Sequence, residues 1–415
     1  MNRKIIFIDM NPAIEQIPIY QLGICFLGGI AIDKKWDVDI IEFSDLQAMG
    51  LDFYKEKFDE ARCIAISIRN IDNTEGSNPV SYIDIIKKEM EYLACRYSEK
   101  IVLGGAGYSI LPNEILDLFN LKYGIVGRGG KSLSEMLDWL DSGNELETFF
   151  SKKIVQSRID CDIYQYEKLE YIWKIIPLIQ NDSKKLGFDT HIGCNGYCVY
   201  CTYPNITQNR NNKRSIDEIC NFIAVAQEKG INQLQIVDDI FNSDIIYAKE
   251  ICKEIAKISH NIKISCYLSP DVDEELAKLM RKAGIIEAVM GIDSLSNSIL
   301  NKMNKNFDEK SIYQARIKLG KEKISVAYTF IVGSLYETDE TLEETKTNIF
   351  KHMPDKITMQ YGIRIYPNTK LYYEMNLKSK SNLKPYFAVS KTLSKEKCLQ
   401  FMSEIKRFID ERKML

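Results

Sequence analysis

The sequence predicts an α/β protein in two parts, a doubly wound parallel sheet followed by a partial barrel of six strand–helix units. Three observations support this prediction. The chain has 415 residues, too many for one ordinary hydrophobic core. Short, continuously apolar runs alternate with amphipathic stretches, as in parallel strands covered by helices on both faces. The alternation stops near residues 151–185 and then resumes, so a boundary is expected there.

The first part, residues 1–150, contains five apolar runs that predict strands and two clear helical patterns. The expected strands are Lys4–Asp9, Val38–Phe43, Cys63–Ile68, Ile101–Leu103 and Tyr123–Val126, and the expected helices include Leu22–Ile32 and Ser81–Tyr97. Alternating strands and helices of this kind form a doubly wound sheet. Ligands of such a domain bind beyond the carboxyl ends of its strands.

Residues 151–185 are charged and aromatic, include Pro177, and indicate a connector. The second part, 186–368, predicts six strands, which are Gly187–His191, Gln233–Val237, Lys263–Leu268, Glu287–Ile292, Val326–Val332 and Ile357–Ile365. The helices between them are Ser215–Lys229, Asp244–Ser259, Val272–Ala283, Asn297–Met303, Glu309–Leu319 and Thr338–Lys351. Right-handed β/α units curl into an incomplete TIM-type barrel with its chemistry at the strand C-termini. The tail, 369–415, predicts a short helical cap with one helix, Ser394–Glu411.

Composition excludes several classes of protein. Hydrophobic residues make up 45% and charged residues 27%, as in ordinary soluble proteins. The net charge is -3 and no long basic stripe occurs, so nucleic acid is not an expected partner. Apolar runs are too short for a membrane span, and Met1 to Asp9 indicates a strand rather than a signal peptide. We expect a cytoplasmic protein without a membrane partner.

The eleven cysteines fall into two groups. Eight are scattered through apolar segments and are expected to pack as small buried hydrophobes. These are Cys25, Cys63, Cys95, Cys161, Cys220, Cys252, Cys266 and Cys398. The other three, Cys194, Cys198 and Cys201, share one glycine-containing loop just after the first barrel strand.

The spacing C-x3-C-x2-C of these three thiols favours an iron–sulfur cluster. Three thiolates on a short loop ligate three irons of a [4Fe–4S] cube and leave the fourth open to a small chelating molecule. Zinc is the competing interpretation, but zinc sites usually pair two C-x2-C motifs or add histidines. Only three histidines occur in the chain, His191, His260 and His352. A chance grouping of core cysteines is the third possibility.

C-x3-C-x2-C with an aromatic, Tyr200, before its third cysteine resembles the radical S-adenosylmethionine (SAM) superfamily. The resemblance implies a [4Fe–4S] cluster on Cys194, Cys198 and Cys201 that binds and reductively cleaves SAM. It also implies that Tyr200 packs near the adenine, and that a flavodoxin- or ferredoxin-type reductant supplies the electron.

Four strand-end segments extend the resemblance over the barrel. They are Val237–Asn242, Gly291–Ser294, Ile331–Thr338 and Gly362–Thr369, and Leu335 stands where relatives commonly have proline. The cofactor contacts that the resemblance implies in them are Asp238, Asp239, Asn242, Asp293, Ser294, Gly333 and Arg364. The aspartates could instead cap the helices that follow them.

The first part resembles the cobalamin-binding, Rossmann-like domains that precede many radical SAM barrels. The matching pieces are Gln21–Ile24, which opens the first helix, and the glycine turn Gly104–Pro112 after the fourth strand. A glycine turn lets the backbone approach a nucleotide tail and its phosphate. The residues implied in cofactor binding here are Gly104, Gly105, Gly107 and Tyr108.

Two departures from the cobalamin-binding pattern matter. The first 190 residues contain no histidine, so a cobalamin bound here has no histidine lower ligand. The corresponding loop, 67–73, resembles a subgroup of cobalamin-dependent radical methylases, with Ser67 and Asn70 near the corrin and Arg69 under the cobalt. Alternatively, Arg69 is a solvated or salt-bridged arginine. The second departure is Gly127–Gly130, which reads Gly-Arg-Gly-Gly where relatives are acidic.

Further polar and aromatic residues have two interpretations each. His191 precedes the cysteine loop and is expected to be hydrogen-bonded and structural rather than catalytic. Tyr267 and Tyr328 lie on barrel strands, where they are candidate substrate contacts or proton donors. Packing residues usually fill a barrel interior, so both tyrosines could be core.

The sequence thus predicts a cobalamin-dependent radical SAM C-methyltransferase acting on a small metabolite or a peptide. The alternative is radical SAM chemistry without methyl transfer, such as epimerisation, dehydration, ring contraction or cyclisation, with or without cobalamin. An iron–sulfur electron carrier or sensor is a third hypothesis, but it leaves the ordered strand-end motifs unexplained.

Overall fold

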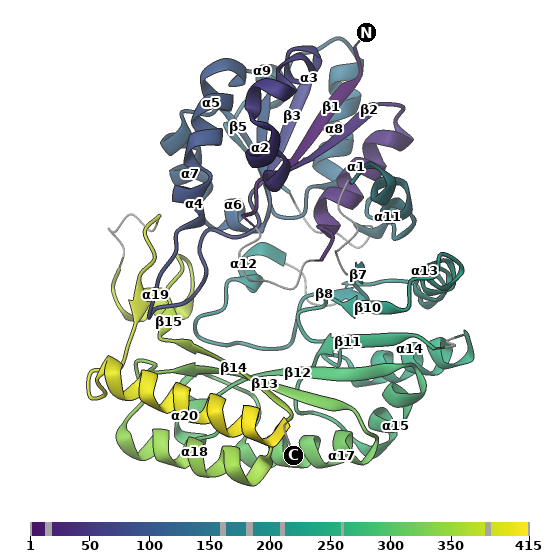
Figure 1. The fold of residues 1–415 in the computed structure, drawn as a ribbon. Coiled ribbons are helices and arrows are strands. Elements are labelled where there is room, and N and C mark those ends of the chain that lie inside the picture. The colour runs from purple at the N-terminus through teal and green to yellow at the C-terminus, as the bar shows by residue number, and fades with distance from the viewer. Residues whose placement is uncertain are drawn as a thin grey trace.

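A computed structural model describes residues 2–12, 19–157, 163–179, 186–207, 212–258, 261–377 and 383–413. It contains two six-stranded parallel sheets, each flanked by helices, stacked one above the other (Figure 1). The α/β class predicted from the sequence is confirmed. Within the described part of the chain, no helix is long and apolar enough to cross a membrane.

The first sheet has the strand order β2-β1-β3-β4-β5-β6. Its strands are β1 (Lys4–Asp9), β2 (Asp37–Glu42), β3 (Cys63–Ser67), β4 (Ile101–Gly104), β5 (Tyr123–Val126) and β6 (Ile154–Gln156). Successive side chains of β1 point to opposite faces, so Ile5 and Phe7 join one hydrophobic core while Ile6 and Ile8 join another. Helices cover both faces of this sheet. One face is covered by α1 (Leu22–Asp33) and α8 (Gly130–Asp141), and the other by α5 (Lys87–Tyr97) and α7 (Pro112–Phe119).

The segment predicted as a connector is more structured than expected. Its residues 154–156 form β6 and extend the first sheet by one strand. Further along, α11 (Glu170–Ile175) packs on α1. The close approach depends on Gly28 and Gly29 of α1, because Cβ atoms there would lie 2.6 Å and 2.2 Å from side-chain atoms of Ile175 and Tyr171. Residues 158–162 and 180–185 of this segment lie outside the described part.

The second sheet has the strand order β14-β13-β12-β11-β10-β7 and does not close on itself. The strands are β7 (Leu186–Phe188), β10 (Gln233–Ile236), β11 (Lys263–Tyr267), β12 (Ile285–Asp293), β13 (Ser325–Val332) and β14 (Lys356–Tyr361). The connecting helices are α13 (Ile216–Glu228), α14 (Ile245–Ile258), α15 (Glu274–Lys282), α16 (Asn297–Lys302), α17 (Glu309–Lys321) and α18 (Asp339–His352). Helices α14, α15, α17 and α18 lie on the side away from the first sheet (Figure 1).

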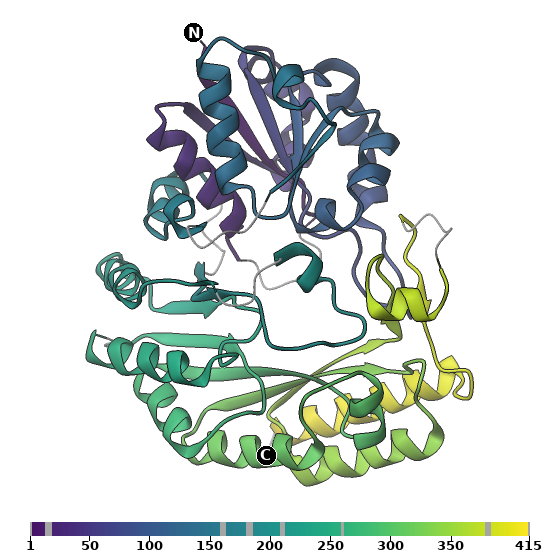
Figure 2. The same cartoon turned by 180° about the vertical axis from the view of Figure 1, so that it is seen from behind.

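The last helix, α20 (Lys395–Lys413), does not cap the active site, as the sequence had suggested for the tail. It packs against β14 beside α18, far from the space between the sheets (Figures 1 and 2). A contact between the rings of Phe350 and Phe408 and an ion pair between Lys346 and Glu404 hold it there. The helix is therefore part of the outer layer of the barrel.

A loop of the first part docks on the end of the second sheet. The Asp72 carboxylate accepts a 2.6 Å hydrogen bond from Arg364, and both side chains are buried. Nearby, the Gln360 amide donates to the Thr74 hydroxyl at 2.8 Å. Arg364 was predicted to contact a cofactor, but its guanidinium is engaged by Asp72 and ties the two parts together.

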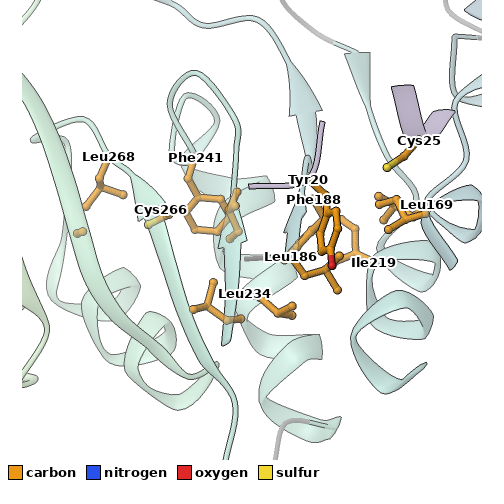
Figure 3. Close-up of a cluster of buried hydrophobic side chains, with 14 of the residues drawn as sticks. Tyr20, Cys25, Leu169, Leu186, Phe188, Ile219, Leu234, Phe241, Cys266 and Leu268 are labelled. Carbon is orange, nitrogen blue, oxygen red and sulfur yellow. The ribbon is translucent and has the colours of Figure 1, made fainter. Parts of the chain in front are cut away.

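One hydrophobic core continues from the first part into the barrel. Figure 3 shows Cys25 and Leu169 near Tyr20, which lies beside Phe188 and Leu186 of β7. Most cysteines predicted for the core are buried, including Cys63, Cys252, Cys266 and Cys398. The prediction is wrong for Cys95, which is exposed on α5; Cys220 is half-buried, and Cys161 lies outside the described residues.

Candidate active site between the two sheets

A cavity of about 320 Å³ opens where the carboxyl ends of the two sheets face each other. Its upper wall comes from the ends of β3, β4 and β5, and its lower wall from residues 191–193 and 237–239. The short helix α12 (Tyr203–Thr207) lines it from the side and lies between the two sheets in both views (Figures 1 and 2). Carboxyl ends of parallel strands are the usual place for ligands in α/β folds.

The cysteine loop begins at the rim of this cavity, directly after the short strand β8 (His191–Ile192). Cys194, Cys198 and Cys201 are all half-buried. A Cβ atom on Gly196 would lie 3.3 Å from the Cys194 sulfur and 3.8 Å from the Cys198 sulfur, so both thiols fold over the same glycine. Burial and the neighbouring thiols of Cys198 and Cys194 raise the pKa of Cys201 to about 12.

This donor set fits a [4Fe–4S] cluster. Three cysteines come from one loop, and Gly196 leaves room beside the Cys194 and Cys198 sulfurs where a side chain would otherwise stand. Among the described residues, no group of three His, Cys, Asp or Glu side chains is arranged to hold a single metal ion. Cys194, Cys198 and Cys201 are therefore the residues that would hold the cluster.

Tyr200 of this loop contacts Asp293, and the family resemblance implied that each of them binds SAM. The Tyr200 hydroxyl donates to the Asp293 carboxylate at 2.5 Å. Asp293 adopts a left-handed backbone (φ 67°) at a break in the pairing of β12 with β13, and aspartate tolerates that conformation. Burial and the Asp293 charge raise the pKa of Tyr200, so its hydroxyl stays protonated.

Lys305 completes this group, and the sequence analysis missed it. Its ammonium lies 2.7 Å from the Asp293 carboxylate and donates to the Gly291 carbonyl at 2.9 Å and to the Tyr200 hydroxyl at 3.2 Å. Burial favours the neutral amine, but Asp293 and Cys198 raise the pKa of Lys305 and keep it charged. A lone lysine after a helix gives no sequence signal of such contacts.

Asp238 and Asp239 both line the cavity but have different partners. The Asp238 carboxylate accepts hydrogen bonds from the Thr190 backbone at 2.6 Å and its hydroxyl at 2.5 Å, and lies 3.2 Å from the His191 ring. His191 also contacts the Ser243 hydroxyl at 2.7 Å, so it is the hydrogen-bonded histidine that was expected. The Asp239 Oδ2 atom is buried without a partner among the described residues, and burial beside Asp238 raises the pKa of Asp239 to about 6.

The unusual Gly127–Gly130 turn acquires a role in this cavity. Arg128 donates to Glu167 at 2.7 Å and to Asp189 at 3.2 Å, and Asp189 in turn pairs with Arg214 at 2.7 Å. The cations and carboxylates alternate, so the charges balance where the first sheet, the connector and the barrel meet. An acidic residue at position 128 would place a further negative charge beside the carboxylates of Glu167 and Asp189.

Ser67, Gly104 and Gly105 line the upper wall, where the resemblance placed the cobalamin contacts. Gly23 and Gly104 fit a large bound group, because Cβ atoms there would meet no other atom closer than 3.9 Å and would enter the cavity. Two features require a glycine at position 105. Its φ is positive, at 101°, and a Cβ atom there would lie 2.5 Å from the Ile68 carbonyl oxygen. These residues would hold the nucleotide side of a cobalamin.

Arg69 and Asn70 are half-buried on the loop that follows β3. The positive charge of Arg69 acts on the hydroxyl of Tyr203, a cavity-lining residue of α12.

Several predicted site residues have other roles in the structure. Tyr108 and Tyr328 are fully buried in the cores, and Tyr328 contacts His352 at 3.1 Å. The other predicted site residues also have partners within the protein. Gly107 packs against the Arg69 backbone, and Gly333 packs against Tyr361 and donates to Glu337. Asn242 donates to the Ser269 and Asp271 carbonyls, and the Ser294 hydroxyl hydrogen-bonds the Thr345 hydroxyl. By contrast, Tyr267 is 44% exposed at the end of β11 and keeps its status as a candidate substrate contact.

Comparison with known proteins bears on this site. Residues 190–348 match the model of the radical SAM superfamily. The uS12 methylthiotransferase RimO of Dictyoglomus thermophilum is 27% identical over 37% of this chain, and the match spans only 37% of that protein. A putative methylthiotransferase of Methanocaldococcus jannaschii is 24% identical over 85% of this chain and 77% of its own length.

Two solved structures share the fold over almost the whole chain. TsrM of Kitasatospora setae, a radical SAM methyltransferase solved with cobalamin and a [4Fe–4S] cluster, has a TM-score of 0.74 at 18% identity over 91% of this chain and 75% of its own. OxsB, a cobalamin-dependent SAM radical enzyme, has a TM-score of 0.72 at 15% identity over 97% of this chain and 66% of its own. The chain therefore carries a radical SAM domain, within a fold that it shares with these two cobalamin-binding radical SAM proteins.

Proposed function

We propose that this protein is a cobalamin-dependent radical SAM C-methyltransferase that acts on a small metabolite or a peptide. One observation carries the proposal: a single cavity joins the glycine-lined ends of the first sheet to the flank of the cysteine loop. Groups held at these two places would face a common space. The fold shared with TsrM and OxsB supports the same assignment.

In this proposal each wall of the cavity has its own task. Cys194, Cys198 and Cys201 hold the cluster, while Tyr200 and Asp293 position the nucleoside of SAM. Ser67, Gly104 and Gly105 hold cobalamin, and Arg69 faces its lower side. When bound, the cluster supplies an electron to SAM, and cobalamin carries a methyl group. A flavodoxin- or ferredoxin-type protein is the proposed reductant, and no nucleic acid is required.

The first test is reconstitution of the full chain without oxygen, with iron, sulfide and hydroxocobalamin. We expect a corrin absorption band that stays with the protein after gel filtration. Because Gly104 faces the cavity, Gly104→Leu should abolish that band while the cluster absorption is retained. A wild-type protein that binds the cluster but no corrin would contradict cobalamin dependence.

Methylthio transfer is a second candidate, favoured by the relative from Methanocaldococcus jannaschii that aligns over 85% of this chain. The two reactions differ in the group added, so mass spectrometry of the product separates a methyl from a methylthio increment. S-adenosylhomocysteine accompanies transfer of a SAM methyl group. Formation of 5′-deoxyadenosine without S-adenosylhomocysteine would instead indicate a radical reaction without methylation.

Cluster chemistry itself is tested by replacing a ligand. Cys198→Ala should lose the visible absorption of the cluster and the release of 5′-deoxyadenosine from SAM with dithionite, because two thiolates hold a cube poorly. Cys95→Ala is the matched control, since this thiol is exposed on α5 and should change neither readout. Absence of SAM cleavage in a wild-type protein with a full cluster would favour an electron carrier or sensor.

A further inference from the structure

Arg128 is the only lysine or arginine among the described residues that line the cavity. Its Nε atom donates to the Glu167 carboxylate at 2.7 Å, and its Nη2 atom donates to Asp189 at 3.2 Å. Within the described part of the chain, no residue accepts a hydrogen bond from the Nη1 atom, which carries two N–H groups. The Arg128 side chain is 24% exposed, whereas those of Glu167 and Asp189 are 4% and 5% exposed. The guanidinium is thus anchored along one edge and open along another.

The glycines around Arg128 explain how it is held. A Cβ atom on Gly130 would lie 2.9 Å from the Cγ atom of Glu167, so this glycine lets the carboxylate reach the guanidinium. Gly127, with a positive φ of 89°, and Gly129 flank the arginine, and both line the cavity with it. The residues on either side of Arg128 therefore place no side chain between it and the cavity.

The charges near Arg128 favour a neutral ligand group over an anion. Arg128 and Arg214 face three carboxylates, those of Glu167, Asp189 and Glu218. A phosphate or carboxylate at the Nη1 atom would meet a cation whose charge is already balanced, and it would lie near other negative charges. A neutral carbonyl oxygen accepts a hydrogen bond from a charged donor without this repulsion.

We propose that Arg128 binds cobalamin by donating a hydrogen bond from its Nη1 atom to a carboxamide oxygen at the rim of the corrin ring. The inference rests on the proposed cobalamin, because Arg128 follows β5 on the same cavity wall as Gly104 and Gly105 at the end of the neighbouring β4. The corrin ring carries several neutral carboxamides, whereas the one phosphate of cobalamin lies in its nucleotide tail. Glu167 holds the guanidinium in advance, so little ordering is needed when cobalamin binds.

The test is the affinity of the full, anaerobically reconstituted protein for hydroxocobalamin, measured by equilibrium dialysis with the corrin absorption as readout. Arg128→Lys keeps a cation beside Glu167 and Asp189, but its shorter side chain ends there, so the dissociation constant should rise about tenfold. Arg128→Met should raise it at least as much, and Arg128→Lys covers the case in which this variant does not fold. Arg96→Met is the matched control, because Arg96 is exposed on α5 and should leave the affinity unchanged.

Cobinamide separates a carboxamide contact from a phosphate contact, because it keeps the corrin carboxamides and lacks the nucleotide tail. Arg128→Lys should weaken the binding of cobinamide and of cobalamin by the same factor. A loss confined to cobalamin would assign Arg128 to the phosphate and overturn the carboxamide contact, and unchanged affinities for both would overturn any contact. A wild-type protein that binds neither corrinoid would instead contradict the proposed function, and this inference with it, so the two failures are distinguishable.

Discussion

At the scale of single residues, burial decides which charges this protein tolerates. Glu337 follows β13 and is 2% exposed; its carboxylate accepts hydrogen bonds from the backbone amides of Gly333 and Ser334. Burial nevertheless dominates and raises the pKa of Glu337 from 4.5 to about 7. The folded protein therefore binds a proton here that the unfolded chain releases above about pH 4.5.

This difference predicts a pH dependence of stability. Below about pH 4.5 both states carry the proton. Between about pH 4.5 and pH 7 only the unfolded chain releases it, so Glu337 lowers the stability progressively and reaches its full effect above about pH 7. Glu337→Gln stays neutral and should gain about 2 to 3 kcal/mol over the wild type between about pH 5 and pH 8. Urea unfolding of both proteins at these two pH values measures the gain. A stability difference that does not change with pH would contradict the prediction.

At the scale of secondary-structure elements, small residues decide which helices can touch. Helix α1 has glycines at positions 28 and 29, which the apolar pattern of the helix does not explain. The structure explains both, because α11 lies directly over them. Helix α11 also holds α1 through polar bonds, since the Tyr171 hydroxyl donates to Asp33 at 2.8 Å.

Gly29→Ala should therefore destabilise the protein although alanine favours helix. Its Cβ atom would lie 2.2 Å from side-chain carbons of Tyr171, and overpacking of this kind costs about 1 to 3 kcal/mol. Gly23→Ala on the same helix meets no other atom within 4 Å and should be neutral or stabilising by up to about 1 kcal/mol. Chemical denaturation of the two variants checks this contrast, and equal stabilities would refute it.

At the scale of the whole molecule, buried ion pairs join the two sheets. Asp72, on the loop after β3, and Arg364, on the short strand β15 (Ile363–Arg364), are 292 residues apart in the sequence and pair at 2.6 Å. Arg128 reaches from the first part to Asp189 of the barrel. A buried pair costs desolvation when it forms, but removal of one partner leaves an uncompensated charge. These pairs therefore contribute little net stability, and their main effect is to fix the relative position of the two sheets around the cavity.

Arg364→Gln should lower the free energy of unfolding by about 3 to 5 kcal/mol, because Asp72 is left buried without its cation. The double variant Asp72→Asn, Arg364→Gln should lose less than the sum of the two single variants, which a double-mutant cycle measures. Lys397→Gln, in an exposed pair with Asp339, should change stability by less than about 0.5 kcal/mol. Additive effects at positions 72 and 364 would show that the pair is not coupled.

The sequence by itself determined the features that depend on local pattern. Apolar runs and amphipathic stretches predicted eleven of the twelve strands in the two described parallel sheets and the long barrel helices, because burial on both faces leaves a periodic signature. They did not predict β6 or several helices of the first part, among them α7 and α8. The cysteine spacing predicted a loop that binds a cluster. This loop lies within residues 190–348, which match the model of the radical SAM superfamily. The glycine turn at Gly104 and Gly105 predicted a backbone that a ligand can approach, and both residues line the cavity.

The tertiary structure decided everything that depends on contacts between distant segments. Lys305 meets Tyr200, Arg128 meets Asp189, and Arg364 meets Asp72 across separations that no local period encodes. For the same reason Tyr108 and Tyr328 proved to be core residues, since a strand or turn position does not say which face is covered. A motif names the residues that can act, but the partners that fix their charge and orientation come from the fold.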